Sequence, residues 1–161
     1  NVLNSQGSVL PIFKDCIKKG GPVEITNRDM TRFVMSIDKA IELVLKAAQI
    51  SKGGEIFILK MPALRVKDLA KAMIKEIAPR YKIIPEKIKM KFVGKRNGEK
   101  MYEELMNEDE AEIASEIEDM FILSSNFNEN NNINKSKIYH SKNSKLMNIK
   151  EIRKMIREVL D

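Results

Sequence analysis

The sequence contains a single cysteine and lacks any long hydrophobic run. Because Cys16 has no second cysteine to pair with, no internal disulfide forms and a reducing compartment is favoured. No stretch approaches the roughly 18 apolar residues that a membrane-spanning helix requires. No charged segment followed by an apolar one opens the chain, as a secretory leader would. We therefore expect a cytoplasmic protein without a membrane span.

The motifs of a cofactor-dependent catalyst are also absent. Dinucleotide binding in a doubly wound α/β fold requires a glycine-rich turn between the first strand and its helix. The chain has 7 glycines, and none makes that spacing: they stand at positions 7, 20, 21, 53, 54, 94 and 98. Short-chain reductases also need a lysine four residues after a tyrosine, but Tyr81, Tyr102 and Tyr139 are followed there by Pro85, Met106 and Asn143. We expect no catalytic and no cofactor-binding residue in this chain.

A metal site and a nucleic-acid site are not expected either. His140 is the single histidine and has no cysteine near it, so a solvated surface side chain is favoured over a metal ligand. The formal net charge is +6, but no block of five or more like charges occurs, which weakens a nucleic-acid interpretation. A basic protein of this kind binds small phosphorylated ligands or simply has a basic surface.

Strand and helix patterns alternate along the chain, which indicates the α/β class. Apolar spacing predicts helices at 9–18, 38–52, 66–78 and 149–160, the second buried on a broad face and capped by Ser36 or Asp38, the last capped by Asn148. A short helix through Tyr102 and Leu105 is predicted as well. Strands are predicted at 23–26, 33–37, 56–59 and 88–93, the third buried and the fourth half-exposed. The chain divides into residues 1–123, an irregular Asn-, Ser- and Lys-rich segment at 124–145, and a C-terminal helix at 146–161.

Two arginines stand in contexts that suggest ligand binding. Arg32 sits among apolar neighbours, where an unpaired guanidinium is costly and a phosphate would satisfy it, although spacing alone favours a salt bridge to Asp29 or Asp38. Arg96 follows a predicted strand and precedes Glu99. The arginine suits a phosphate and the carboxylate suits a vicinal diol such as ribose, while an ordinary charged turn is the simpler alternative.

The opening residues offer small polar groups and amides ahead of a helix. Asn1, Ser5, Gly7 and Ser8 suit an anion, and an unexceptional loop is equally compatible with them.

Four motifs in order resemble one family over almost the whole chain. Residues 1–13 resemble its G-N-V-L-G-S-R-G-S-V-I-P-x-F, and the segment from Gly20 to Asp38 resembles its G-G-P-x-x-x-T-x-x-x-M-T-R-F-x-M-x-I-x-x-A. Residues 54–62 resemble G-E-I-F-x-x-K-M-P, and residues 94–105 resemble G-x-R-x-G-E-K-x-x-E-E-L. The chain is similar to the extended short-chain dehydrogenase/reductases of polysaccharide biosynthesis, typified by UDP-N-acetylglucosamine 4,6-dehydratase.

The resemblance implies the C-terminal part of an extended Rossmann-type, NAD(P)-binding fold: the last sheet strands plus a small, mostly helical substrate-binding region. It implies that Asn1 and Arg32 approach the pyrophosphate of a UDP-sugar and that Arg96 contacts the phosphate side of the UDP. Glu99 would bind the ribose hydroxyls. The residues implied beside the uracil are Ser8, Val9 and Pro11.

The resemblance further implies that NADP or NAD serves the complete enzyme and is bound mainly by an N-terminal Rossmann half that this chain lacks. The complete enzyme is expected to be a homo-oligomer without a metal and to convert the sugar to its 4-keto-6-deoxy form. Three positions depart from the family pattern: Asn4 replaces Gly, Gln6 replaces Arg and Asn97 replaces Pro, so a cofactor or subunit contact at position 6 is in doubt.

Two other functions remain open. The chain could be half of a UDP-sugar 4-epimerase, which shares the fold and the UDP contacts, or a non-catalytic nucleotide-binding or assembly module. Nucleic-acid binding has only the net charge in its favour.

Overall fold

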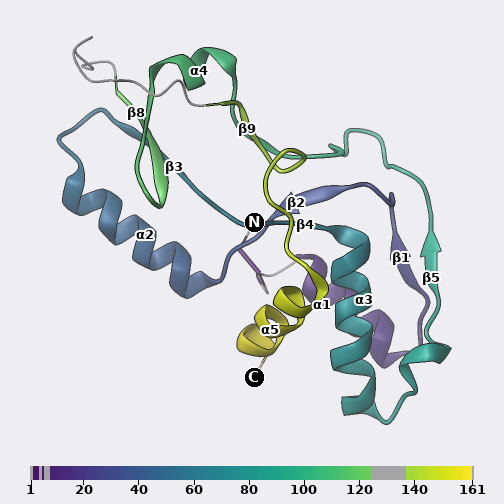
Figure 1. Cartoon of the computed structure of the whole chain (residues 1–161). Helices are drawn as coiled ribbons and strands as arrows, with labels where there is room; N and C mark the ends of the chain where they lie inside the picture. The colour runs from purple at the N-terminus through teal and green to yellow at the C-terminus, as the bar shows by residue number, and fades with distance from the viewer. Residues whose placement is uncertain (1, 4, 6–7, 125–136, 161) are drawn as a thin grey trace.

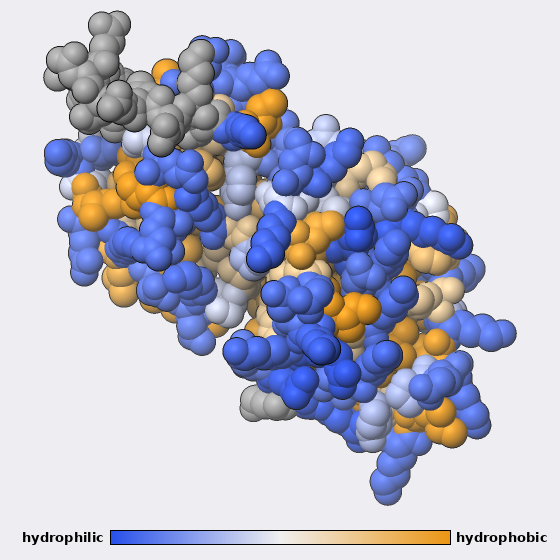
Figure 2. All heavy atoms as spheres, viewed as in Figure 1, coloured by the Kyte–Doolittle hydropathy of each residue, from blue (hydrophilic) through white to orange (hydrophobic). Residues whose placement is uncertain are grey.

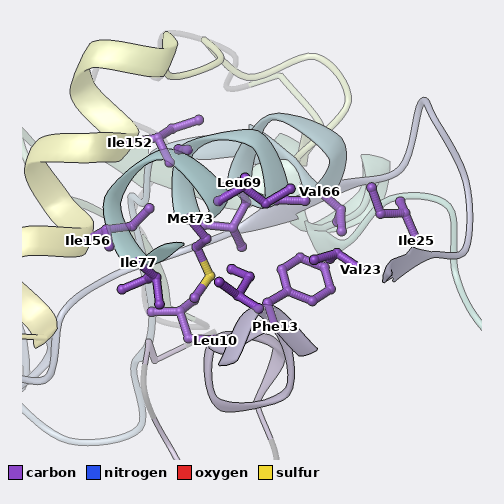
Figure 3. Packing of buried hydrophobic residues seen from close by; sticks show 14 of the residues in the cluster. Leu10, Phe13, Val23, Ile25, Val66, Leu69, Met73, Ile77, Ile152 and Ile156 are labelled. Atoms are coloured by element: carbon purple, nitrogen blue, oxygen red, sulfur yellow. The ribbon is translucent and has the colours of Figure 1, made fainter. Parts of the chain in front are cut away.

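Three helices pack together to form the main core. The computed structural model describes residues 2–3, 5, 8–124 and 137–160. Helices α1 (Val9–Lys18), α3 (Val66–Ile77) and α5 (Ile149–Leu160) lie against one another in the lower part of Figure 1. Each turns an apolar stripe inward, so that their side chains interlock in Figure 3; those labelled on the three helices are Leu10, Phe13, Val66, Leu69, Met73, Ile77, Ile152 and Ile156. Burying one such side chain contributes about 1.5–3 kcal/mol, which makes this cluster the main source of stability.

A parallel strand pair closes one side of this core. Strand β1 (Val23–Ile25) pairs with β5 (Met90–Phe92), so that Val23 lies opposite Met90. The 3-10 turns η1 (Ala78–Tyr81) and η2 (Pro85–Lys87) connect α3 to β5. Gly21 has a φ of +88°, and a Cβ added there would meet the Ile88 side chain at 3.1 Å, so this turn requires glycine.

A second, antiparallel pair runs across the middle of the molecule. Strand β2 (Thr31–Phe33) pairs with β4 (Ala63–Arg65), and Arg32 lies opposite Leu64. Residues 137–147 lie against these strands. The Met147 amide donates to the Ala63 carbonyl of β4 at 2.8 Å. Asn148 then caps α5 by accepting hydrogen bonds from the amides of Lys150 and Glu151.

The remaining elements lie toward the upper left of Figure 1. The antiparallel sheet β3-β8-β7 contains β3 (Ile56–Leu59), β8 (Met120–Leu123) and β7 (Ala114–Glu116). Helix α2 (Ile37–Ile50) lies beside it, and α4 (Glu108–Ile113) precedes β7 with a capping box of Asn107 and Glu110. Strands β6 (Glu104–Met106) and β9 (Tyr139–His140) form a further antiparallel pair.

The predicted class is confirmed at its coarse level, as a mixed α/β fold of small sheets and helices. The helices predicted at 9–18, 66–78 and 149–160 are confirmed, as is the cap of α2, since the Ser36 hydroxyl accepts from the Lys39 amide at 3.2 Å.

Five details of the prediction were wrong. No helix passes through Tyr102 and Leu105; Leu105 lies in strand β6, which pairs with a strand remote in sequence. The strand expected at 33–37 lies at 31–33, where β4 pairs with it. Helix α2 is largely exposed instead of buried on a broad face, and Ile56 of the supposedly buried strand β3 is 61% exposed. In the segment expected to be irregular, residues 139–140 form β9, while residues 125–136 lie outside the described part of the chain.

Candidate nucleotide-binding site

The site begins where the two parallel strands end. Because β1 and β5 run in the same direction, the segments that follow them leave the sheet at the same end of the two strands. The Val93 amide donates to the Ile25 carbonyl at 3.0 Å, which holds the two exits side by side. As a result the Thr26 hydroxyl donates to Oε1 of Glu99 at 3.3 Å, although the two residues are far apart in sequence.

Arg32 reaches the same place from β2. Side chains alternate along a strand, and with Thr31 and Phe33 buried in the interior, the Arg32 side chain emerges on the opposite face, where it is 24% exposed. Its Nη1 donates to the Thr31 carbonyl and its Nη2 to the Lys100 carbonyl, each at 2.8 Å. These bonds use two of the five N–H donors of a guanidinium, so the remaining donors are available to a ligand.

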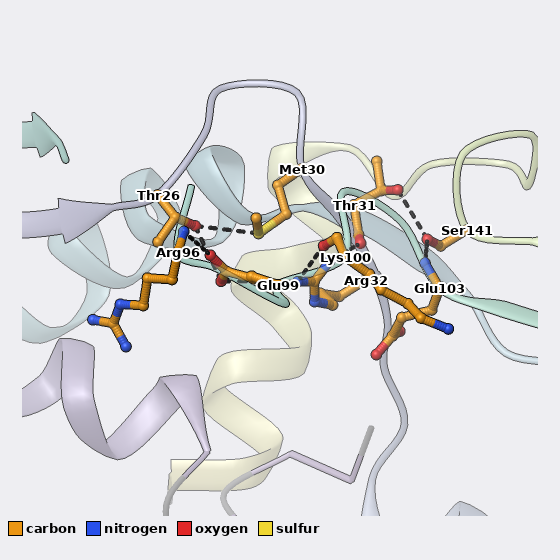
Figure 4. Close-up of polar contacts among 9 residues, drawn as sticks. All are labelled: Thr26, Met30, Thr31, Arg32, Arg96, Glu99, Lys100, Glu103 and Ser141. Carbon is orange, nitrogen blue, oxygen red and sulfur yellow. Dashed lines mark hydrogen bonds and ion pairs between the residues drawn. The ribbon is translucent and has the colours of Figure 1, made fainter. Parts of the chain in front are cut away.

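Glu99 joins the two segments. Its Oε1 lies 4.0 Å from Nη2 of Arg32, and its Oε2 accepts from the Arg96 amide at 3.2 Å (Figure 4). Neither Asp29 nor Asp38, the partners that spacing favoured for Arg32, forms this ion pair. The carboxylate is therefore held by Thr26 and Arg32 from a remote segment and by the Arg96 amide of its own turn.

A buried serine supports the site from behind. Ser141 is 0% exposed, and its hydroxyl lies 2.9 Å from the Thr31 hydroxyl and accepts from the Glu103 amide at 2.9 Å. The Glu103 carboxylate accepts from the Phe33 amide at 2.7 Å. No local pattern indicates this role, because a serine in a polar tract resembles any solvated serine.

The other predicted residues are only partly brought together. The Arg96 side chain is exposed and directed away from Arg32 in Figure 4, so it meets Glu99 through its backbone. Ser8 is the N-cap of α1, and its buried hydroxyl has no hydrogen-bond partner among the described residues. Val9 and Pro11 lie half-buried in the first turn of α1. Asn1 lies outside the described residues.

The ionisable groups with displaced pKa values lie elsewhere, and Asp119 and Tyr139 are among them. The Lys46 ammonium hydrogen-bonds the Asp119 carboxylate at 2.5 Å and lowers the pKa of that carboxyl below its ordinary 3.8. Burial raises the pKa of Tyr139, whose hydroxyl donates to the Met61 carbonyl at 2.9 Å. Both groups tie segments together and do not belong to the Arg32–Glu99 contact.

The chemistry available at the site is recognition of an anion with polar neighbours. Arg32 offers directional donors, and the exposed cations of Lys95, Arg96 and Lys100 lie on the adjoining loop. Within the described residues, no three histidine, cysteine, aspartate or glutamate side chains gather closely enough to hold a metal ion. The helices formed by those residues include none with the length and apolar content of a membrane span.

Known proteins match the chain over most of its length. A family model described as "Polysaccharide biosynthesis protein" matches residues 1–125. An uncharacterized membrane protein of Methanocaldococcus jannaschii is 53% identical over 159 residues, which make up 99% of this chain and 47% of that protein. A UDP-glucose 4-epimerase of Rickettsia massiliae is 33% identical over 97% of this chain and 47% of its own length. The capsular polysaccharide biosynthesis protein CapD of Staphylococcus aureus is 46% identical over 68% of this chain and 18% of its own length.

A solved structure shows the same relation. The X-ray structure of Pen from Bacillus thuringiensis superimposes with a TM-score of 0.88 and 40% sequence identity, over 99% of this chain and 48% of that chain. The present chain therefore spans about half the length of Pen and half or less of these curated relatives.

Proposed function

Since the chain belongs to the polysaccharide biosynthesis protein family, we propose that the Arg32–Glu99 site binds the nucleotide part of a UDP-sugar. One observation carries the proposal: Arg32 of β2 and the sequence-remote Glu99 meet beside Thr26, the residue that follows strand β1 of the parallel pair. Such strand ends are the usual ligand-binding edge of α/β sheets.

Each side chain has a part in this proposal. The free donors of Arg32 bind the diphosphate, because a guanidinium matches phosphate oxygens with directional bonds. The Arg96 side chain, which is directed away from Arg32 in the structure, would turn toward the same phosphates when the ligand binds. The Glu99 carboxylate would repel phosphate but accepts hydrogen bonds from a neutral diol, so it is assigned to the ribose hydroxyls. The uracil side is assigned to Ser8, Val9 and Pro11, and Asn1 to the pyrophosphate.

The proposed reaction is that of a sugar-nucleotide 4,6-dehydratase, with this chain anchoring the UDP. Binding energy from a part of the substrate remote from the reacting carbons holds the hexose in register. The chain offers no glycine-rich turn for NADP or NAD, so the cofactor and the catalytic residues are assigned to polypeptide outside it.

A 4-epimerase is the second candidate. The observation in its favour is the Rickettsia massiliae relative, which carries that name and matches 97% of this chain. Both reactions use the same anchoring of UDP, so the site proposed here serves either one. A product assay on the complete enzyme distinguishes them, because only the dehydratase releases water and forms a 4-keto-6-deoxy sugar.

Titration calorimetry with UDP tests the site. Arg32→Ala and Arg96→Ala should each weaken UDP binding by roughly 1.5–3 kcal/mol, the scale of a hydrogen bond to a charged group. Arg80→Ala, on η1 beyond the far end of α3, is the matched control and should bind UDP as the wild type does. Unchanged UDP affinity in both site variants, with the fold intact by circular dichroism, would return these arginines to ordinary surface charges.

A further inference from the structure

The positive charge of the protein is concentrated in residues 79–96, which we call the basic segment. It contains 7 of the 29 lysines and arginines but only 1 of the 23 acidic residues, Glu86. Its excess of 6 positive charges equals the formal net charge of the whole chain, so the other residues are balanced in charge. All the basic side chains of the segment are exposed: Arg80, Lys82, Lys87, Lys89, Lys91, Lys95 and Arg96.

The basic segment follows one side of the molecule. It runs from η1 through η2 and β5 to the loop after that strand, along the right of Figure 1. Strand β5 pairs with β1 on one side and has no strand partner on the other within the described residues. Lysines on an edge strand oppose pairing with another chain, but Lys82 and Lys87 lie outside β5. Protection of the edge therefore does not explain the charge of the whole segment.

Apolar side chains are exposed among these cations. Tyr81, Ile84, Phe92 and Val93 are between 37% and 53% exposed. Figure 2 shows hydrophobic surface among hydrophilic side chains at the lower right of the molecule, in the region of η1, η2 and β5. Such a combination matches the boundary of a lipid bilayer, where cations meet anionic headgroups and apolar groups enter beneath them.

The aromatic rings of the segment favour a bilayer over a nucleic acid. The Lys18 ammonium lies 5.9 Å from the centre of the Tyr81 ring, and the Arg28 guanidinium carbon lies 4.7 Å from that of the Phe92 ring. One face of each ring is thus covered by a cation of the protein itself, which leaves less aromatic surface for the stacking of bases. Lysine also outnumbers arginine in the segment, although arginine is the residue that binds base edges with paired hydrogen bonds.

We propose that the basic segment binds the surface of a membrane that contains anionic phospholipids. Its lysines lie at the level of the headgroup phosphates, while Ile84 and Val93 enter the apolar boundary beneath them. This interaction goes beyond the proposed function and does not rest on it. Lys95 and Arg96 adjoin the candidate nucleotide site, so both are left unchanged in the experiments below.

Co-sedimentation with lipid vesicles tests the role of the charge. The protein should bind vesicles of phosphatidylcholine that contain about one third phosphatidylglycerol, and binding should weaken as the salt concentration rises. Vesicles of phosphatidylcholine alone should not bind it. The triple variant Lys87→Gln, Lys89→Gln, Lys91→Gln should lower the partition coefficient at least roughly twentyfold, because each cation near an anionic surface contributes a factor of roughly five.

The triple variant Lys52→Gln, Lys145→Gln, Lys150→Gln is the matched control. It removes the same charge from exposed lysines outside the basic segment. Its partition coefficient should stay within about threefold of the wild type, since charges farther than a Debye length from the bilayer are largely screened. Equal losses in the two triple variants would show a dependence on net charge alone and overturn the proposal. Absence of binding to the anionic vesicles would overturn it as well.

Tryptophan fluorescence tests the apolar contact, because the sequence contains no tryptophan and a single introduced one is the sole reporter. The emission of Ile84→Trp should shift to shorter wavelength when anionic vesicles are added, as the indole leaves water for the interface. Ile41→Trp is the control, since Ile41 on α2 is 51% exposed and Ile84 is 53% exposed. A shift at position 41 as large as that at position 84 would show that α2 enters the bilayer and would contradict the proposal.

Two further measurements separate this proposal from the other functions. A fluorescent single-stranded oligonucleotide is titrated at the same salt concentrations. Tighter binding of the oligonucleotide than of the vesicles, lost in the variant of residues 87, 89 and 91, would assign the segment to nucleic acids instead. That variant should bind UDP as the wild type does, and Arg32→Ala should bind vesicles normally. A failure of the proposed nucleotide site therefore leaves the vesicle results unchanged.

Discussion

The guanidinium of Arg32 and the carboxylate of Glu99 face each other at 4.0 Å, with both side chains about three-quarters shielded from solvent. Each side chain also has other partners. The arginine donates to two backbone carbonyls, and the glutamate accepts from the Thr26 hydroxyl and the Arg96 amide. A ligand that places an anion at the arginine and a diol at the glutamate would therefore satisfy both without breaking the framework around them.

Glu99→Gln should change which nucleotides bind more than how tightly UDP binds. Glutamine keeps the size and one acceptor oxygen but removes the charge that strengthens a hydrogen bond from a ribose hydroxyl. We expect UDP affinity to fall by about 0.5–1.5 kcal/mol, less than for Arg32→Ala. The ratio of the dissociation constants of 2′-deoxy-UDP and UDP, measured by calorimetry, should move toward one. An unchanged ratio would show that Glu99 does not contact the ribose hydroxyls.

Ser141→Ala should destabilise the whole fold. The hydroxyl is fully buried and bonds to both Thr31 and Glu103, so its removal takes a partner from two interior polar groups. The expected loss in the free energy of unfolding is about 1–3 kcal/mol, measured in urea. Ser51→Ala, which removes an exposed hydroxyl, is the control and should stay within about 0.5 kcal/mol of the wild type.

Asp119→Asn should destabilise the protein in a pH-dependent way. The hydrogen bond from Lys46 lowers the folded-state pKa of this carboxyl below 3.8, so the stabilisation is fully present above that value and is lost as the pH falls through the folded pKa. The difference in melting temperature between wild type and variant, followed by circular dichroism from neutral pH downward, should be largest at neutral pH and shrink below about pH 4. A difference that stays constant to low pH, or one equal to that of Asp15→Asn, contradicts the role of the pair.

The isolated chain should not turn over a nucleotide sugar. It encodes neither the glycine-rich turn nor the Tyr/Lys pair that the reaction requires. Incubation of the purified chain with UDP-N-acetylglucosamine and NADP or NAD should give no 4-keto product and no epimer by chromatography. Turnover above that of a heat-denatured sample would show that catalytic residues lie within these 161 residues.

Local sequence patterns predicted the helices whose apolar residues recur at regular helical spacing. The apolar spacing of Leu10, Phe13 and Ile17 fixed α1 to the residue, and that of Ile152 and Ile156 identified α5. The stretch through Leu105 was mistaken for a helix, because its pairing as β6 depends on Tyr139 and His140, which no local signal connects to it.

The candidate site was predictable as residues but not as an arrangement. Sequence context and the family motifs both singled out Arg32, Arg96 and Glu99, whereas the Ser141 support arises only when residues 137–147 return to β2. Ile41 and Val44 were predicted to lie on a broad buried face, but both are exposed. The periodicity of apolar residues shows that a helix has an apolar face. It does not show whether other residues of the same chain bury that face.

The outer edge of β2 is closed by the loop that carries the candidate site instead of by another strand. The Thr31 amide donates to the Met101 carbonyl at 3.0 Å, and the Phe33 amide donates to the Glu103 carboxylate at 2.7 Å. The loop after Glu99 thus also holds the outer edge of β2 in place. It cannot swing open as a lid without removing the acceptors of two strand amides, so we expect it to stay in place when a ligand binds beside it.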